Sequence, residues 1–107
     1  SASVTQFTSD ERVKENIAEY TKGLAEIEAI DVKSFNYVYN KNRNVVGVIA
    51  QELEQILPEA VEQTHFETPD KSLSFTDFRM VDQNRLFYTM LNAIKELSAK
   101  VTALENK

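Results

Sequence analysis

FRMVDQNRLFYTMLNAIKELSAKVTALENK, residues 78–107, is the stretch that decides the fold. Its apolar residues recur every seven positions in two series that are offset by three. The first series, at heptad position a, is Met80, Phe87, Ile94 and Val101. The second, at position d, is Met90, Leu97 and Leu104, and the polar Gln83 holds its remaining place. The pattern predicts one helix from Phe78 to Lys107, about 30 residues and roughly 45 Å long.

This helix carries two kinds of surface along its length. Leu86, Leu91 and Ala93 widen the apolar face of the earlier turns, whereas the last turns are otherwise polar. We expect the first half to pack against the body of the domain and the second half to pair with copies of itself. The predicted contact, called the seam below, consists of Phe87, Met90, Ile94, Leu97, Val101 and Leu104. The alternative is an amphipathic helix that folds back on its own chain.

The composition of the chain limits the classes of function that it can have. One hundred and seven residues suit a single domain, and the net charge of -5 argues against a nucleic-acid-binding module. The chain has no cysteine, so disulfides and thiolate sites are excluded. No apolar run is long enough to cross a membrane, and the N-terminus lacks the layout of a signal peptide. Because the chain starts without Met, we expect it to be a fragment of a longer protein.

The rest of the chain predicts short elements of both types. Residues 1–8 are interpreted as an extended lead-in, and the acidic, polar run after Ser9 as a helix start. Further helices are expected at residues 20–30, with Gly23 as a weak point, and at 50–57, stopped by Pro58. Strands are expected around residues 32–39, 45–49, 60–66 and 73–75, with turns at 40–44 and 67–71. Asp77 is the expected cap of the long helix.

One pair of residues suggests a reaction. A serine hydroxyl is a poor nucleophile until a base takes its proton, and a neutral lysine amine can be that base. Ser9 and Lys14 are five residues apart, so a serine at a helix cap can turn toward the lysine one turn onward. Arg12 and the first-turn amides would then lie near a developing oxyanion. The alternative is an ordinary serine cap with a solvated lysine nearby.

Other polar residues do not predict a site. His65 has no triad partner near it in sequence, and a solvated position is expected. Glu52, Glu54 and Glu59 are expected to form the wet face of a helix. We therefore predict neither a metal site nor a cofactor.

The run Ser9-Asp10-Glu11-Arg12-Val13-Lys14-Glu15-Asn16-Ile17 resembles the opening signature of the peptidase S74 family, the C-terminal intramolecular chaperone domains of phage tailspikes, endosialidases and tail fibres. The likeness continues through Phe35-Asn36-Tyr37, Gly47-Val48-Ile49-Ala50-Gln51-Glu52, Leu57-Pro58-Glu59-Ala60-Val61 and Ala93-Ile94-Lys95-Glu96-Leu97. It therefore covers Ser9 to the C-terminus, and it divides the chain into a lead-in or fibre end at 1–8 and a chaperone domain at 9–107.

The resemblance implies roles for particular residues. Ser9 and Lys14 match the serine and lysine that cut the chain, here between Thr8 and Ser9. Asp10, Arg12 and Asn16 lie in the same signature. Gly47 and Gln51 are expected to support the site, Gly47 through a close backbone approach and Gln51 by holding the Ser9 segment. The alternative is that both residues are simply structural. Ile and Val at a with Leu at d favour two strands, but the family forms trimers, and Phe87, Met90 and Leu91 are bulkier than a pair of helices needs.

We therefore predict an α+β domain, with a small antiparallel sheet and short helices at the base of a long C-terminal helix that forms a trimeric coiled coil. The expected function is an intramolecular chaperone that trimerises, registers the upstream fibre of the same polypeptide and is released by self-cleavage. It would act in the host cytoplasm during virion assembly and be absent from the mature fibre. The alternative is a permanent trimerisation or receptor-tip module without enzymatic activity.

Overall fold

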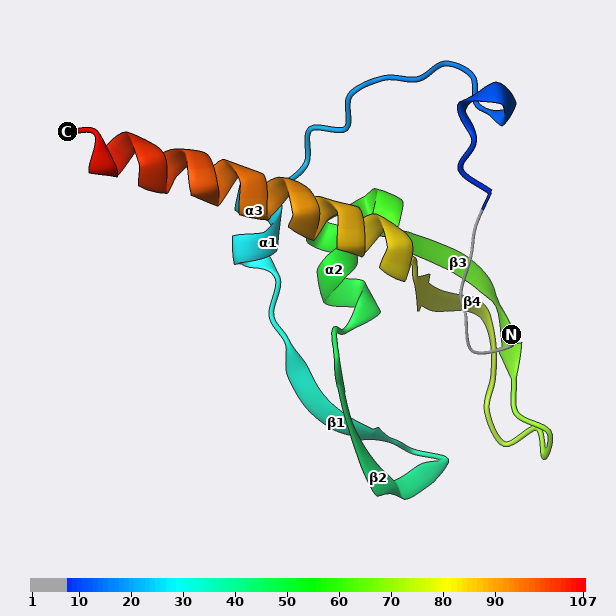
Figure 1. Cartoon of the computed structure of the whole chain (residues 1–107). Helices are drawn as coiled ribbons and strands as arrows, with labels where there is room; N and C mark the ends of the chain where they lie inside the picture. The colour runs from blue at the N-terminus through cyan, green and yellow to red at the C-terminus, as the bar shows by residue number, and fades with distance from the viewer. Residues whose placement is uncertain (1–7) are drawn as a thin grey trace, which may run out of the picture.

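A computed structural model describes residues 8–107, which form an α+β chain with two separate two-stranded antiparallel sheets (Figure 1). The lead-in was predicted at residues 1–8, and residues 1–7 of it lie outside the described residues. Both β-hairpins project from a small body that holds the start of the C-terminal helix, and the end of that helix extends away from the body. The α+β class is confirmed, whereas the single small sheet that we expected is two independent hairpins.

The C-terminal helix, α3, spans Gln83–Glu105 and begins later than its heptad pattern predicts. Residues 78–81 belong instead to strand β4, where Val81 pairs with Val61 and Met80 pairs with Glu62. Asp82, not Asp77, is the cap, because its carboxylate accepts a hydrogen bond from the Arg85 amide at 3.1 Å. Pairing with the preceding strand thus overrides the helical period at Met80, which drops out of the heptad series at position a.

The first hairpin joins β1 (Lys33–Tyr37) to β2 (Asn40–Gly47). Its turn is at residues 38–39, so the polar turn predicted at residues 40–44 is wrong. Asn40 pairs with Tyr37 and Val45 pairs with Phe35, with a register shift between Phe35 and Tyr37. The side-chain amide of Asn44 donates a hydrogen bond to the Ser34 hydroxyl on the opposite strand at 2.8 Å. Cross-strand pairs of this kind help to stabilise an exposed hairpin.

The second hairpin joins β3 (Val61–Glu67) to β4 (Ser74–Val81). Asp70 orders its loop by accepting hydrogen bonds from the amide and the hydroxyl of Ser72, at 3.0 and 2.7 Å. These bonds, with the Ser72 amide contributing most, lower the pKa of Asp70 below its usual value. The strand predicted at 60–66 is present one residue later, the turn lies within the predicted 67–71, and β4 is longer than the predicted strand at 73–75.

Two short helices lie between the hairpins and α3. Helix α1 spans only Leu24–Ala29 of the predicted 20–30, because Gly23 is its cap and not an interior weak point. A Cβ at Gly23 would lie 2.0 Å from Glu96 Oε1, so glycine permits the close approach of α1 to α3. Helix α2 spans Ala50–Ile56, one residue shorter than the predicted 50–57, and the 3₁₀ helix η2 follows at Pro58–Ala60.

The core is small and lies under the first half of α3. Leu53, Leu57 and Ala60 are buried, and Leu86 of α3 packs against them. The radius of gyration is 18.0 Å, whereas a compact chain of this length would have about 13 Å. Because Leu86 packs against this core, the first half of α3 lies on the body, as predicted. No helix in residues 8–107 has the length and apolar character needed to cross a membrane.

Aromatic rings connect the two hairpins on one side of the molecule. Tyr37 stacks on Tyr39 with ring centroids 5.2 Å apart, and Tyr39 lies 6.4 Å from Phe66 of the second hairpin. Phe66 in turn stacks on Phe78 at 4.3 Å. Contacts of this kind add to the burial of the rings, so they help to set the angle between the hairpins.

Candidate functional site

The predicted reactive residues lie on an arm, residues 8–22, which precedes α1 and passes over α3 (Figure 1). Its only helical turn is η1 (Glu11–Val13), a 3₁₀ turn capped by Asp10, whose carboxylate accepts from the Arg12 amide at 2.9 Å. The helix start predicted after Ser9 is therefore present, although it is a single turn. That turn brings the residues on either side of it together.

Ser9 and Lys14 meet across this turn. The ammonium of Lys14 donates a hydrogen bond to the Ser9 hydroxyl, with Nζ 2.9 Å from Oγ. This distance is within the reach needed for proton transfer between a nucleophile and a base. Both side chains are exposed to solvent in a single chain. The geometry can pass a proton from serine to lysine once the amine is neutral.

Arg12 points toward Asp10 and forms a two-pronged contact with its carboxylate, at 3.0 Å from Nε and 2.8 Å from Nη2. The guanidinium contributes most, and the Arg12 amide next, to lowering the pKa of Asp10. The guanidinium is largely exposed, so the pair orders the turn more than it stabilises the fold. Arg12 thus shapes the turn between Ser9 and Lys14 and is not directed at a reacting carbonyl.

The arm continues through Asn16, whose φ of 54° is in the left-handed region that asparagine tolerates. It is then fastened to α3 at its far end. The Tyr20 hydroxyl lies 2.9 Å from the Thr89 hydroxyl, and Asn92 donates to the carbonyl oxygens of Tyr20 and Lys22 at 2.8 and 2.9 Å. The arm is therefore anchored beside α1, whereas Val13 and Ile17 remain 67% and 75% exposed.

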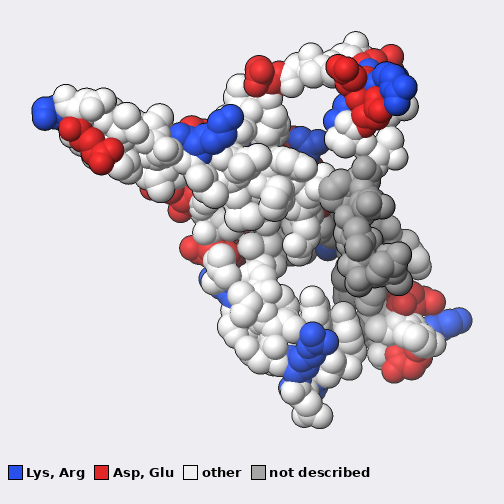
Figure 2. Space-filling view, in the orientation of Figure 1, with Lys and Arg blue, Asp and Glu red and all other residues white. Residues whose placement is uncertain are grey.

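An open groove of about 590 Å³ lies between the arm and α3, and it is visible as an opening in Figure 2. We call it the arm groove. It is lined by Lys14, Ala18, Glu19, Tyr20, Asp82, Asn84, Arg85, Tyr88, Leu91 and Asn92. Arg85 stacks over the Tyr20 ring, with Cζ 5.7 Å from the ring centroid. Its Nε is buried and has no acceptor among residues 8–107.

Gly47 and Gln51 are not brought to the dyad. Neither lines the arm groove, and Figure 1 shows α2 and η1 on opposite sides of α3. A Cβ at Gly47 would meet Phe35 at 3.4 Å, an ordinary contact, so the close approach that we expected there is found at Gly23 instead. Gln51 is exposed on α2.

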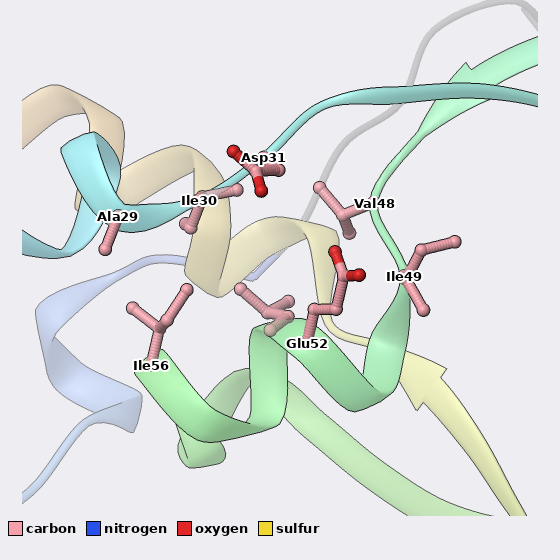
Figure 3. Close-up of a pocket in the computed structure, with 8 residues that line it drawn as sticks. Ala29, Ile30, Asp31, Val48, Ile49, Glu52 and Ile56 are labelled. Carbon is pink, nitrogen blue, oxygen red and sulfur yellow. The ribbon is translucent and has the colours of Figure 1, made fainter.

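The motif that contains Gly47 and Gln51 forms a second, smaller pocket of about 120 Å³ (Figure 3). Val48, Ile49 and Leu53 line it together with the end of α1. The carboxylates of Asp31 and Glu52 lie at its margin. His65 is exposed on β3, and no group of three metal-ligating side chains occurs within residues 8–107.

The seam is exposed in the single chain. The exposed fractions of its residues are 55% for Phe87, 43% for Met90, 65% for Ile94, 51% for Leu97, 47% for Val101 and 65% for Leu104. The opposite side of α3 holds the polar residues Arg85, Thr89, Asn92 and Glu96, which face the arm and α1. The sequence did not lead us to predict this polar face, which we call the polar stripe. The spacing of its residues by three and four positions could have revealed it, because such residues lie on one side of a helix.

The chain resembles proteins of phage tail fibres. It is 36% identical over 102 residues to a probable tail fiber protein of Escherichia phage Phieco32, covering 92% of this chain and 13% of that protein. It is 29% identical over 107 residues to long tail fiber protein Gp37 of Enterobacteria phages K3 and T2, covering 92% of this chain and 8% and 7% of those proteins. The chain thus spans a small part of the length of these relatives.

Residues 9–62 match the Peptidase_S74 family, which is described as the chaperone of endosialidase. The match begins at Ser9 and includes Lys14, the first hairpin and α2, and ends near the start of β3. It covers half of the chain. This chain therefore belongs to the Peptidase_S74 family.

Proposed function

We propose that this chain is an intramolecular chaperone for a phage tail fibre, and that it separates from the fibre by cutting its own backbone between Thr8 and Ser9. The observation that carries the cleavage is the 2.9 Å hydrogen bond between Lys14 Nζ and Ser9 Oγ, at the residue where the family match begins. The tail fibre relatives support an upstream fibre as the partner.

The exposed seam supports self-association. Six apolar residues at a and d positions, 43–65% exposed, would cover one another if three parallel copies of α3 came together. Holding three fibre ends together raises the effective concentration of strands that must pair in register. Fibrous β-structure folds slowly because its contacts are long-range, so such a clamp speeds correct assembly. We place this work in the host cytoplasm during virion assembly.

The proposed reaction starts when Lys14, in its neutral form, removes the proton of the Ser9 hydroxyl. Oγ attacks the carbonyl carbon of Thr8, the bond between that carbon and the Ser9 nitrogen breaks, and Lys14 returns the proton to the leaving amine. Water then hydrolyses the resulting ester, giving a Thr8 carboxylate and a free Ser9 hydroxyl. Burial of Lys14 favours its neutral amine, so cutting is expected to wait for assembly.

The test is to express the chain with a fibre segment or folded carrier before Ser1 and to measure the intact mass of the products. The parent should separate after Thr8, whereas Ser9→Ala and Lys14→Arg should stay joined, since a guanidinium does not give up its proton. Ser98→Ala and Lys22→Arg are matched controls that should be cut. Cutting of Ser9→Ala at the parental rate would rule out this reaction.

A second candidate is a permanent trimerisation or receptor-tip module in which Ser9 only precedes a capped turn. The exposure of both Ser9 and Lys14 in the single chain favours it, because water stabilises the ammonium form of an amine, which has no lone pair to accept the serine proton. In that case the assembled parent would keep the upstream segment indefinitely, while the seam would still associate.

A further inference from the structure

The arm groove begins at the reactive pair. Lys14, whose Nζ lies 2.9 Å from the Ser9 hydroxyl, is one of its lining residues. The segment of chain before Ser9 therefore starts beside this groove. Consecutive Cα atoms are about 3.8 Å apart, so the Cα atom of Phe7 is tied within about 8 Å of that of Ser9. The groove is thus within reach of the residues on the upstream side of the proposed cut.

The formal charges of the arm groove balance. Lys14 and Arg85 contribute two positive charges to its lining. Glu19 and Asp82, which also line it, contribute two negative charges. An occupant with a net charge would be attracted by one pair and repelled by the other. Residues 1–8, SASVTQFT, carry no charged side chain, so the charge of the groove suits the segment that precedes the cut.

The wall of the groove on α3 offers a place for an aromatic ring. Tyr88 and Leu91 line it and are 45% and 46% exposed. Phe7 is the large apolar side chain closest to Ser9 on its upstream side. A phenyl ring packed on Tyr88 and Leu91 would remove apolar surface from water and add an aromatic contact.

The same wall holds a side chain that lacks an acceptor. The buried Nε of Arg85 finds no hydrogen-bond partner among residues 8–107, and a buried donor without a partner is costly. An extended peptide presents one carbonyl oxygen per residue, and this acceptor is neutral. Such an oxygen can pair with the guanidinium without bringing a carboxylate to Lys14, so Lys14 stays able to lose its proton.

We propose that residues 4–7 occupy the arm groove of their own chain before the cut, with the Phe7 ring on Tyr88 and Leu91. The docked segment holds the Thr8 carbonyl beside the Ser9 hydroxyl and covers Lys14, and the loss of water favours the neutral amine that the reaction needs. The docking rests on the proposed function, because it concerns the carbonyl side of the bond that is cut. It goes beyond that function by naming the segment that the site recognises.

The direct test is disulfide formation in the full chain, which has no cysteine of its own. The variants carry Ser9→Ala so that the upstream segment stays attached. A disulfide requires Cα atoms within about 7 Å, so Phe7→Cys should form one within the same chain when combined with Tyr88→Cys or with Leu91→Cys. Intact mass with and without reductant measures the bond and shows whether it joins one chain or two.

Phe7→Cys combined with Gln51→Cys is the matched control and should stay reduced, because α2 and η1 lie on opposite sides of α3 (Figure 1). A disulfide that forms only with Gln51→Cys, or only between two chains, would overturn the docking. The absence of a disulfide in both groove combinations would overturn it as well.

A second test measures the rate of cutting in the active chain with a folded carrier before Ser1. Phe7→Ala should slow the cut about tenfold or more, whereas Phe7→Leu, which restores apolar bulk, should stay within about threefold of the parent. Gln6→Ala should also stay within about threefold, because neighbouring side chains of an extended segment point to opposite sides. Equal rates for the parent and Phe7→Ala would overturn the docking and leave the proposed reaction standing. If the parent is not cut, the reaction falls, and the disulfide test alone decides the docking.

Discussion

The hydroxyl of Tyr20 lies 2.9 Å from the hydroxyl of Thr89, although 69 positions separate the two residues. Thr89 is fully buried and also donates to the Arg85 carbonyl oxygen at 2.8 Å. Since a hydroxyl has one proton, Thr89 serves as the acceptor for Tyr20 when it donates to Arg85. This contact, with the two bonds from Asn92, fastens the arm to α3.

We expect Thr89→Val to lower the free energy of unfolding by about 1–2 kcal/mol, because it leaves the Tyr20 hydroxyl without its partner. Urea denaturation at fixed protein concentration measures the change. Tyr20→Phe should have a smaller effect alone and little effect in the Thr89→Val background. Tyr39→Phe, at an exposed ring, is the control. If the losses of unfolding free energy from Tyr20→Phe and Thr89→Val simply add in the double variant, the two hydroxyls are not in direct contact.

The two glycines should respond differently to alanine. A Cβ at Gly23 would lie 2.0 Å from Glu96 Oε1 and 3.2 Å from Asn92 Cβ, whereas one at Gly47 would lie 3.4 Å from the Phe35 ring. We expect Gly23→Ala to cost about 1 kcal/mol or more through overpacking, and Gly47→Ala to stay within about 0.5 kcal/mol. Truncation of Glu96 to alanine should relieve part of the Gly23→Ala cost. Thermal unfolding that gives equal shifts for both glycines would contradict the packing of α1 on α3.

The seam should control association without controlling the fold of the chain. Ile94 and Leu97 are 65% and 51% exposed and touch no part of the core cluster. Replacing both with Asp should dissociate the assembly, because charges would enter its apolar interior, and should leave the helical circular dichroism near the parental value. Lys95→Asp with Ser98→Asp adds acids on the same turns and should retain the parental mass. Sedimentation equilibrium decides whether the double seam variant is still assembled.

The titration of Asp10 should depend on Arg12. The Arg12 side chain, and then its amide, hold the pKa of Asp10 below the ordinary value. A carboxyl with a lowered pKa stabilises the turn at neutral pH, and this contribution is lost as the pH falls through the Asp10 pKa. NMR titration of Arg12→Ala should show the Asp10 midpoint moving upward, toward that of an ordinary aspartate. The distant Arg43→Ala should leave it unchanged. A midpoint unaffected by Arg12→Ala would mean that solvent already screens the pair.

The local sequence pattern was enough to predict several elements of the structure. Alternation of apolar and aromatic residues indicated strands in both hairpins, Pro58 marked the end of α2, and the spacing of Ser9 and Lys14 across a capped turn predicted their contact. The seam residues of α3 are exposed in the single chain, and their pairing with other copies stays a prediction. These features are set by neighbours within a few residues, so periodicity and capping chemistry carry them.

Only the tertiary structure decided where α3 begins, which glycine is packed and where the arm lies. Met80 fits the helical period, but residues 78–81 gain backbone hydrogen bonds to β3. Gly23 resembles a helix breaker until Glu96, 73 positions later, is seen against it. The polar residues Arg85, Thr89 and Asn92 contact Tyr20 and Lys22 of the arm, which are about 70 positions away in the sequence. The sequence of α3 alone therefore does not explain why these positions are polar. Contacts of that separation leave no local period in the sequence, and the cost of closing such long loops is met only when the whole chain folds.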